Sequence, residues 1–211
     1  VTTAAGSPVA TTAALPSCVV VPALTEGPYF VDEKINRSDI RSDPSTGNMR
    51  PGTPLTIALN ISRVSGGACA PLSNAMVDVW HCDALGVYSD VNDSMAGGNT
   101  VGQKFLRGYQ LTDASGQARF TTIYPGWYQG RAVHIHFKIR INNTEFTSQF
   151  FFDEATSSLV FSQAPYSQKG TAGITTNARD GIFNQGGSEL LLAPVKSGDG
   201  YAATFSMGLR A

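Results

Sequence analysis

The segment LTIALNIS at residues 55–62 alternates large apolar residues with small or polar ones. Successive side chains of a β-strand point to opposite faces, so Leu55, Ile57, Leu59 and Ile61 would share one face. The small and polar residues between them would share the other face. The segment is therefore predicted to be a strand with one face in a hydrophobic core.

Other segments repeat this two-residue period, and clusters of turn-forming residues separate them. The clusters are SGGACAPLSN (65–74), DASGQ (113–117) and INNTE (141–145). No long segment has helical periodicity. Many short strands joined by turns predict an all-β fold, an antiparallel β-sandwich with long loops. Further strands are expected at residues 75–82, 118–123, 133–141, 145–152 and 201–209.

Two stretches lack strand patterns. Residues 1–20 are rich in Ala and Thr and carry no charge, which is typical of a flexible leader. Residues 153–195 are predicted to be long surface connections with a short helix near 155–161, and we expect part of them to wrap the mouth of a site. A chain of 211 residues suits one domain, expected over residues 21–211.

The charge balance excludes some classes of partner. Fifteen Lys and Arg residues against 16 Asp and Glu give a net charge of -1, so no broad basic surface is available for nucleic acid. No run of about 18 apolar residues is present, so no membrane span is expected. Only three histidines are present, and any histidine site must draw on this small stock.

The cysteines bear on the cellular compartment. Cys18, Cys69 and Cys82 can form one disulfide and leave one thiol over, or remain three buried thiols. A strand over 75–82 would place Cys82 roughly 25 Å from the turn that holds Cys69, which disfavours that pair. Cys18 can reach either partner. The leader and the low charge lead us to expect an exported, extracellular protein.

The segment RAVHIHFKIRI at residues 131–141 is the first candidate for chemistry. Its apolar residues Val133, Ile135 and Phe137 would share one strand face, which places His134 and His136 together on the other face, about 6.6–6.8 Å apart along the strand. Two imidazoles at this spacing can bind one metal ion. An exposed pair of polar residues is the commoner use of such a pattern.

More ligands are needed to complete a metal site. His81 would complete a three-histidine zinc or copper site with His134 and His136. Tyr88, in ALGVYSD, and Tyr128, in YPGWYQG, are the competing candidates, because nearby Gly and Pro residues give them loop backbone. Tyrosine more often packs at the rim of a core, and these alternatives stay open on the residues alone.

Four segments together resemble the intradiol ring-cleavage dioxygenases, a family that includes catechol 1,2-dioxygenases and protocatechuate 3,4-dioxygenases. The segments occur in the order in which the family has them, and the chain resembles its secreted single-domain branch. They are TEGPYF (25–30), WHCDALGVYS (80–89), TIYPGWYQGRAVHIHF (122–137) and SQFFF (148–152).

The resemblance implies an Fe(III) site with Tyr88, Tyr128, His134 and His136 as its four protein ligands. It leaves His81 as a structural residue near the site. Two tyrosinates and one hydroxide would neutralise the trivalent ion, which favours a buried ferric site. In the family the axial tyrosinate, matched here by Tyr128, dissociates and acts as a base.

Further residues carry over from the same match. Arg131 matches an arginine that stabilises the electron-rich substrate, and Gln149 matches a glutamine that contacts the reacting centre. Segment 27–29 and one tryptophan are expected to line the substrate pocket. These lining residues are Gly27, Pro28, Tyr29 and Trp127.

The resemblance implies that O2 cleaves catechol-type rings to muconate-type diacids, with broad acceptance of catechols and long loops around the active site. The expected partners are small catechols and O2, and neither nucleic acid nor a membrane. The residues before TEGPYF lack the helical pattern that cytoplasmic members use to dimerise, so a monomer is expected. The alternatives are the three-histidine zinc or copper enzyme and a β-sandwich binding module without catalysis.

Overall fold

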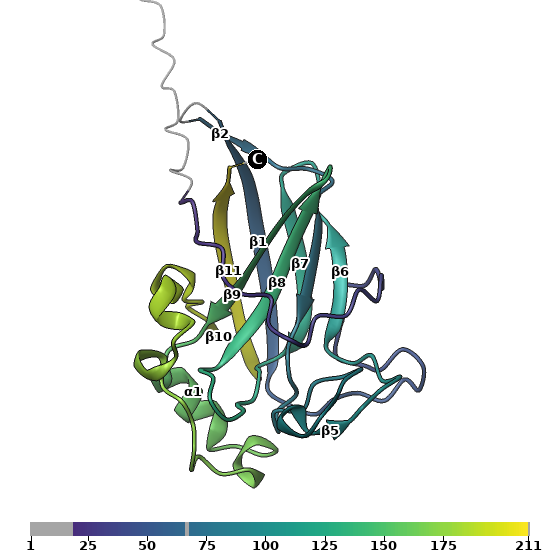
Figure 1. The fold of residues 1–211 in the computed structure, drawn as a ribbon, viewed down its shortest axis with the longest axis vertical. Coiled ribbons are helices and arrows are strands. Elements are labelled where there is room, and N and C mark those ends of the chain that lie inside the picture. Colours follow the sequence, from purple (N-terminus) through teal and green to yellow (C-terminus); the bar gives the residue numbers. More distant parts are fainter. Residues whose placement is uncertain (1–18, 66–67, 211) are drawn as a thin grey trace, which may run out of the picture.

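Two β-sheets face one another in the computed structural model, which describes residues 19–65 and 68–210 (Figure 1). The first sheet is built around the strand that contains the alternating segment 55–62. Its strands, in spatial order, are β10 (Val195–Ser197), β11 (Gly200–Leu209), β1 (Pro54–Ser65) and β2 (Ala68–Pro71), and β7 (Gln117–Ile123) also pairs with β1.

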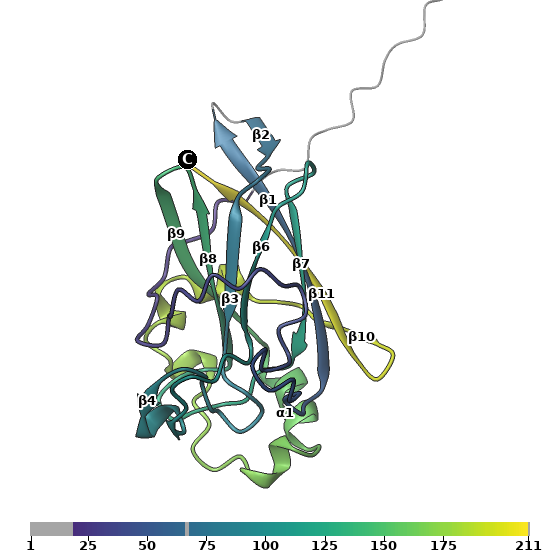
Figure 2. The same ribbon diagram turned by 90° about the vertical axis from the view of Figure 1, so that its right-hand side faces the viewer.

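The second sheet has four strands and carries the histidine pair. Figure 2 shows it as a separate layer beside β1, β7 and β11. A small ribbon of two strands lies near one end of the molecule, formed by β4 (Asn92–Asp93) and β5 (Gly98–Asn99). In order, the second sheet contains β6 (Arg107–Leu111), β3 (Met76–Trp80), β8 (His134–Ile141) and β9 (Thr144–Phe151).

The alternation in β1 has the predicted structural effect. Leu55, Ile57, Leu59 and Ile61 are all buried between the sheets, whereas the residues between them are at most half-buried. The second sheet contributes aromatic rings such as Phe137 to this core. The prediction of an all-β sandwich is thus confirmed, and the buried apolar area holds the two layers together.

One pairing differs from a purely antiparallel sandwich. Strand β11 runs parallel to β1, from the pair Leu55–Tyr201 to the pair Arg63–Leu209. On its other side β1 pairs with β7 and β2, both antiparallel. The first sheet is therefore mixed, because β11 reaches β1 only after a long connection rather than through a hairpin.

The five further strands and the helix are confirmed to within one or two residues. Helix α1 (Glu154–Phe161) begins after Asp153, whose carboxylate accepts a hydrogen bond from the Thr156 amide at 2.7 Å. Short 3-10 turns follow it and cover the end of the sandwich (Figure 1). They are Tyr166–Gln168, Asn177–Arg179, Phe183–Gln185 and Gly187–Leu190, and a further turn, Ser94–Ala96, joins β4 to β5.

Five of the strands among the described residues were not predicted from the sequence, and two of them, β4 and β5, form the small ribbon. Strand β2 lies within the expected turn cluster 65–74, and β10 is a three-residue partner of β11. Strand β6 has the sequence RGYQL, and its first residue, Arg107, is a buried charged residue. A short strand that buries a charge lacks the alternation on which the other assignments depend.

The cysteines differ in state. Cys69 is disulfide-bonded, and Cys82 is a free, buried thiol whose pKa is raised by burial. Cys69 and Cys82 are therefore not paired with each other, as the spacing predicts. Cys18 and residues 1–18 of the expected leader lie outside the described residues.

The last two residues of the expected leader, Val19 and Val20, are described and contact β11. Val20 forms a parallel bridge with Gly208, and the Val19 carbonyl accepts a hydrogen bond from the Gly208 amide at 2.8 Å. Within residues 19–65 and 68–210, no helix is long and apolar enough to cross a membrane.

Candidate metal centre

The candidate site lies where β3 ends and β8 begins. Tyr88 belongs to the loop that follows β3, and Tyr128 belongs to the connection between β7 and β8. His134 and His136 occupy the first and third positions of β8 and therefore project from one face of that strand. The small ribbon that contains β5 and the segment that contains α1 lie at this end of the sandwich (Figure 1).

The donor atoms of these four side chains converge on one point. Oη of Tyr128 lies 3.1 Å from Nε2 of His134, and Oη of Tyr88 lies 3.5 Å from the same nitrogen. Nε2 of His136 lies 3.0 Å from it. All four residues are buried, the most exposed being Tyr128 at 8%. The alternative interpretation of His134 and His136 as an exposed pair of surface residues is therefore wrong.

The tautomer of His134 is set by the backbone. Its Nδ1 lies 2.6 Å from the carbonyl oxygen of Ala132, and a carbonyl can only accept a hydrogen bond. Nδ1 therefore carries the proton, and Nε2 presents its lone pair to the other three side chains. A backbone carbonyl on the distal nitrogen is the usual way in which a metal-binding histidine is oriented.

His136 is held mainly by ring packing. It stacks on Trp80, with the ring centroids 4.9 Å apart and the planes 10° from parallel. On another side the backbone of Gly27 comes so close that a Cβ added there would lie 3.1 Å from Cε1 of His136. Gly27 also has a φ of 71°, which other residues adopt only with strain.

Burial keeps the unliganded side chains neutral. It lowers the pKa of His134 to about 3 and that of His136 well below its ordinary value, so both imidazoles have free lone pairs at neutral pH. Burial also raises the pKa of Tyr88 and Tyr128. Two phenols can ionise here only if a cation compensates the charge, as a bound metal ion does.

The spacing of the donor atoms fits a single metal ion. Metal–nitrogen and metal–oxygen distances of about 2.0–2.2 Å place neighbouring ligand atoms roughly 2.8–3.6 Å apart in the common coordination geometries. The distances that join His134 to the other three donors, 3.0–3.5 Å, lie in this range. Two phenolate oxygens make the donor set hard, which suits a trivalent ion.

His81 does not join the site. Its Nδ1 lies 2.7 Å from the Cys82 carbonyl and its Nε2 lies 2.7 Å from the Thr122 hydroxyl, so both ring nitrogens already have partners. Among the described residues, no group of three or more His, Cys, Asp or Glu side chains is arranged to hold a metal. The three-histidine alternative therefore lacks its geometry.

Arg131 and Gln149 are in direct contact. Nη2 of Arg131 donates to Oε1 of Gln149 at 2.5 Å, and Gln149 is paired with His136 in the register of β8 and β9. Gln149 in turn donates to the Thr25 carbonyl at 2.7 Å. The expected arginine and glutamine thus form one network beside the converging side chains.

The expected lining residues occupy two places. Tyr29 packs against the site, its ring 4.6 Å from that of Tyr88 and 6.2 Å from that of Tyr128. Pro28, beside Gly27, is exposed. The indole of Trp127 instead donates to the Gly170 carbonyl at 3.0 Å, in the segment after α1.

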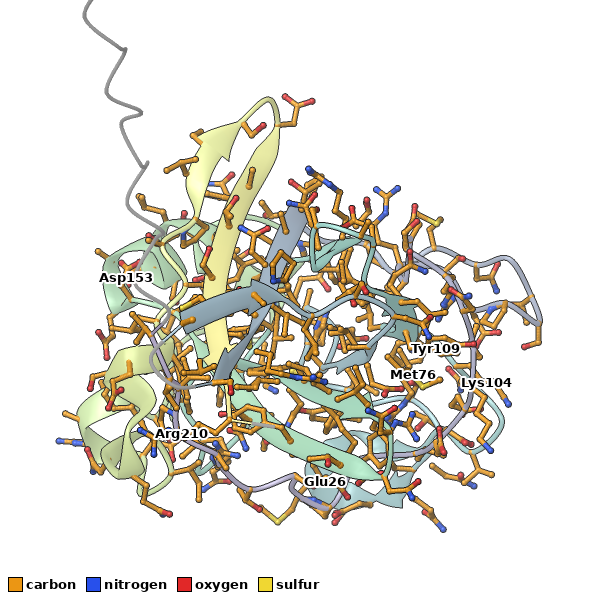
Figure 3. The ribbon with its side chains drawn as sticks, turned by 90° about the horizontal axis from the view of Figure 1, so that it is seen from above. Glu26, Met76, Lys104, Tyr109, Asp153 and Arg210 are labelled. Carbon is orange, nitrogen blue, oxygen red and sulfur yellow. The ribbon has the colours of Figure 1, made fainter. Side chains whose placement is uncertain are left out.

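The segment that carries Gly27 and Tyr29 is tied to the second sheet. Glu26 pairs with the ammonium group of Lys138 on β8, which also pairs with Glu145 at 3.0 Å. The same ammonium lies 4.4 Å from the ring centroid of Phe30. Figure 3 shows Glu26 on the outer side of the layer that contains β8 and β9.

Three residues near the site were not predicted from the sequence. The carboxylate of Asp93 accepts the hydroxyl hydrogen of Tyr29 at 3.1 Å, and burial together with this carboxylate raises the pKa of Tyr29 to about 12. Asp180 pairs with Arg131 across 49 residues. No local motif marks either carboxylate.

Arg107, the third missed residue, is almost completely buried. Its guanidinium donates to the Tyr29 carbonyl at 2.6 Å and to the Ser89 hydroxyl at 2.8 Å, so it links the lining segment to the loop of Tyr88. Burial lowers its pKa to about 10. The segment RGYQL has no apolar alternation, so no local pattern marks Arg107 as a buried residue.

Comparison with known proteins shows which families and proteins this chain resembles. The family described as dioxygenase matches residues 25–169. A chlorocatechol 1,2-dioxygenase of Pseudomonas putida is 27% identical over 147 residues, which cover 61% of this chain and 52% of that protein. The catechol 1,2-dioxygenase 2 of Acinetobacter lwoffii is 33% identical over 135 residues, which cover 55% and 45%. The chain spans about half the length of these relatives.

A solved structure matches over more of its length. An intradiol ring-cleavage dioxygenase from Tetranychus urticae superimposes with a TM-score of 0.79 at 31% identity, covering 92% of this chain and 95% of that one. The matched region of the family includes all four converging side chains, Arg131 and Gln149. The chain therefore belongs to the intradiol ring-cleavage dioxygenase family.

Proposed function

We propose that this protein uses ferric iron and O2 to cleave catechol-type rings between the two hydroxylated carbons, giving muconate-type diacids. The observation that carries the proposal is the convergence of Tyr88, Tyr128 and His136 within 3.5 Å of Nε2 of His134. The relatives named as catechol and chlorocatechol 1,2-dioxygenases support the substrate class.

Tyr88, Tyr128, His134 and His136 would hold the iron. Two phenolates and a hydroxide balance the charge of Fe(III), which lets the ion remain in a buried site. When bound, the ferric ion would chelate the deprotonated catechol and make its ring carbons reactive toward O2.

Tyr128 is the better placed of the two tyrosines to act as a base. It is 8% exposed, whereas Tyr88 is completely buried. Burial raises the pKa of the Tyr128 hydroxyl. A free Tyr128 phenolate in this pocket therefore takes up a proton readily, and an incoming catechol hydroxyl is the donor that we assign to it.

Arg131 would supply fixed positive charge to the substrate. A guanidinium is a planar cation, and the hydrogen bond from Arg131 to Gln149 limits the orientations of this one. A positive charge that is already oriented stabilises an electron-rich ring without further reorganisation. Gln149, which is completely buried, would fix the position of Arg131 and contact the reacting substrate.

The test combines colour with turnover. Tyrosinate bound to ferric iron absorbs visible light, so the iron-loaded protein should be red to burgundy. Oxygen uptake with catechol, protocatechuate and hydroxyquinol, followed by identification of the products, would measure the breadth of substrate acceptance. A colourless protein that holds stoichiometric zinc and does not consume oxygen would overturn the proposal.

We also propose that the protein works outside the cell as a monomer. The disulfide of Cys69 supports the location, because disulfides persist in oxidising compartments. Detection of the protein in the culture medium rather than in the cell extract of its source tests the location. Sedimentation of the purified protein at the mass of one chain tests the oligomeric state.

A further inference from the structure

We infer that Asp180 is a positioning residue for the reaction centre, acting through both Arg131 and His134. This inference rests on the proposed function, since it assigns Arg131 its role toward the substrate. Asp180 lies in the irregular segment after α1 and contacts none of the four candidate ligands directly. It is nevertheless almost completely inaccessible to solvent, at 1%.

The carboxylate of Asp180 has donors on both oxygens. Oδ2 accepts from Nε of Arg131 at 3.0 Å and from the amide of Ala132 at 2.8 Å. Oδ1 accepts from the amides of Ile182 at 2.7 Å and Phe183 at 3.4 Å. An ionised carboxylate can accept all four hydrogen bonds. The side-chain amide of an asparagine has the same shape but carries N–H donors in place of one oxygen, so it cannot accept all four.

The first consequence concerns Arg131. Asp180 binds its Nε, and Gln149 binds its Nη2, so two edges of the guanidinium are fixed at once. The planar group then has one orientation, and its remaining N–H groups are directed by the two anchors. Without Asp180, the hydrogen bond to Gln149 is the one that the guanidinium would keep among the described residues.

The second consequence concerns His134. The amide of Ala132 is held by Asp180, and the carbonyl of the same residue accepts the Nδ1 proton of His134 at 2.6 Å. Ala132 therefore connects the Asp180 carboxylate to the imidazole that stands at the centre of the converging donors. Outer contacts of this kind fix the ring orientation of a metal ligand.

The first experiment compares Asp180→Asn with Asp78→Asn in the iron-loaded protein. Asp78 is the matched control, because it is also a buried carboxylate that pairs with an arginine of β8, Arg140 at 2.8 Å. We expect Asp180→Asn to lower kcat by about 10–100-fold. Asp78→Asn should keep the wild-type kcat. Equal losses in the two variants would overturn the inference.

Two further readouts separate positioning from general damage. The dissociation constant for catechol can be measured without oxygen from the visible spectrum. It should change less than about threefold in Asp180→Asn, because this variant is expected to slow the reaction of bound catechol rather than to weaken its binding. The double variant Arg131→Gln/Asp180→Asn should be slower than Arg131→Gln alone, because Asp180 also acts through Ala132 and His134, but by clearly less than the loss that Asp180→Asn causes in the wild type. Losses that multiply would show that Asp180 does not act through Arg131.

The last readout needs no iron and no turnover. In the metal-free protein the Arg131 Nε–H signal, assigned by its absence in Arg131→Gln, should be protected from hydrogen exchange. This protection should be lost in Asp180→Asn and kept in Asp78→Asn. Rapid exchange in the wild type would overturn the inference, whereas a wild-type protein that cleaves no catechol would overturn only the proposed function.

Discussion

Oη of Tyr128 lies 3.1 Å from Nε2 of His134, so a loop residue and the first residue of β8 meet at the centre of the candidate metal site. The two residues are six positions apart, and the turn between them carries Arg131 and Ala132. One short segment therefore supplies two candidate ligands, the candidate substrate-binding arginine and the carbonyl that orients His134.

The His134→Ala variant should lose iron. The nitrogen that lies within 3.5 Å of the three other donors is removed, so the remaining side chains no longer surround one point. We expect the iron content to fall to a small fraction of the wild-type value, together with the visible absorption. Elemental analysis of the purified variant measures this directly.

The His81→Ala variant is the control for that result. It removes two hydrogen bonds from a buried residue, which costs about 2–4 kcal/mol in the free energy of unfolding. The iron content should nevertheless stay at the wild-type level. Release of the metal by His81→Ala, with no effect of Tyr88→Phe, would mean that the ligands are assigned wrongly.

The stability of the metal-free protein should fall on acidification. Burial lowers the pKa of His81 to about 4 from an ordinary value of 6.5, so the unfolded chain binds the proton first as the pH drops. The contribution of His81 to the free energy of unfolding is fully present above pH 6.5. About 3 kcal/mol of it is lost as the pH falls from 6.5 to 4.

Chemical denaturation at a series of pH values measures this effect. His134, whose pKa is lowered to about 3, adds to the loss over the same range and below it. The His81→Gln variant should show a shallower pH dependence than the wild type, by about one proton. Identical slopes in the two proteins would contradict the assignment of a buried neutral His81.

The Glu26→Gln variant should weaken substrate binding. Glu26 ties the segment of Gly27 and Tyr29 to Lys138, and it is 40% exposed, so the ion pair is worth only about 0.5–1 kcal/mol. The KM for catechol should therefore rise about two- to fivefold, with kcat nearly unchanged. Glu145→Gln removes the other partner of the same ammonium and should leave KM unaltered.

The two described cysteines should respond differently to reagents. Cys82 is buried and its thiol pKa is raised, so it should react with a thiol reagent only after unfolding. Cys69→Ser removes a disulfide and should lower the free energy of unfolding by about 2–4 kcal/mol. Iron content should be unchanged in this variant, because β2 lies at the end of the sandwich away from α1 (Figure 1).

Local pattern was enough to predict most of the fold and the histidine pair. Alternation identified β1, β3, β7, β8, β9 and β11, since each buries a face, and the same period placed His134 beside His136. Alternation does not identify the partner of a strand or its direction. The parallel pairing of β1 with β11 was therefore not predictable from it.

The outer residues of the site depend on contacts that local pattern does not encode. Asp180 lies in a segment without periodicity, 49 residues from Arg131, and only the tertiary structure brings the two together. Arg107 is buried in a strand that its own charge makes hard to recognise. Polar residues at such positions are chosen by individual hydrogen bonds rather than by a repeating face.

The parallel pairing of β1 with β11 also means that β1 is synthesised long before its partner strand. Asn60 of β1 and Ser206 of β11 face each other across 146 residues of chain. At roughly 5–20 residues per second, a ribosome needs about 7–30 s to make the second strand after the first. During that time one hydrogen-bonding edge of β1 stays open, and the nascent chain must be protected from pairing with other chains.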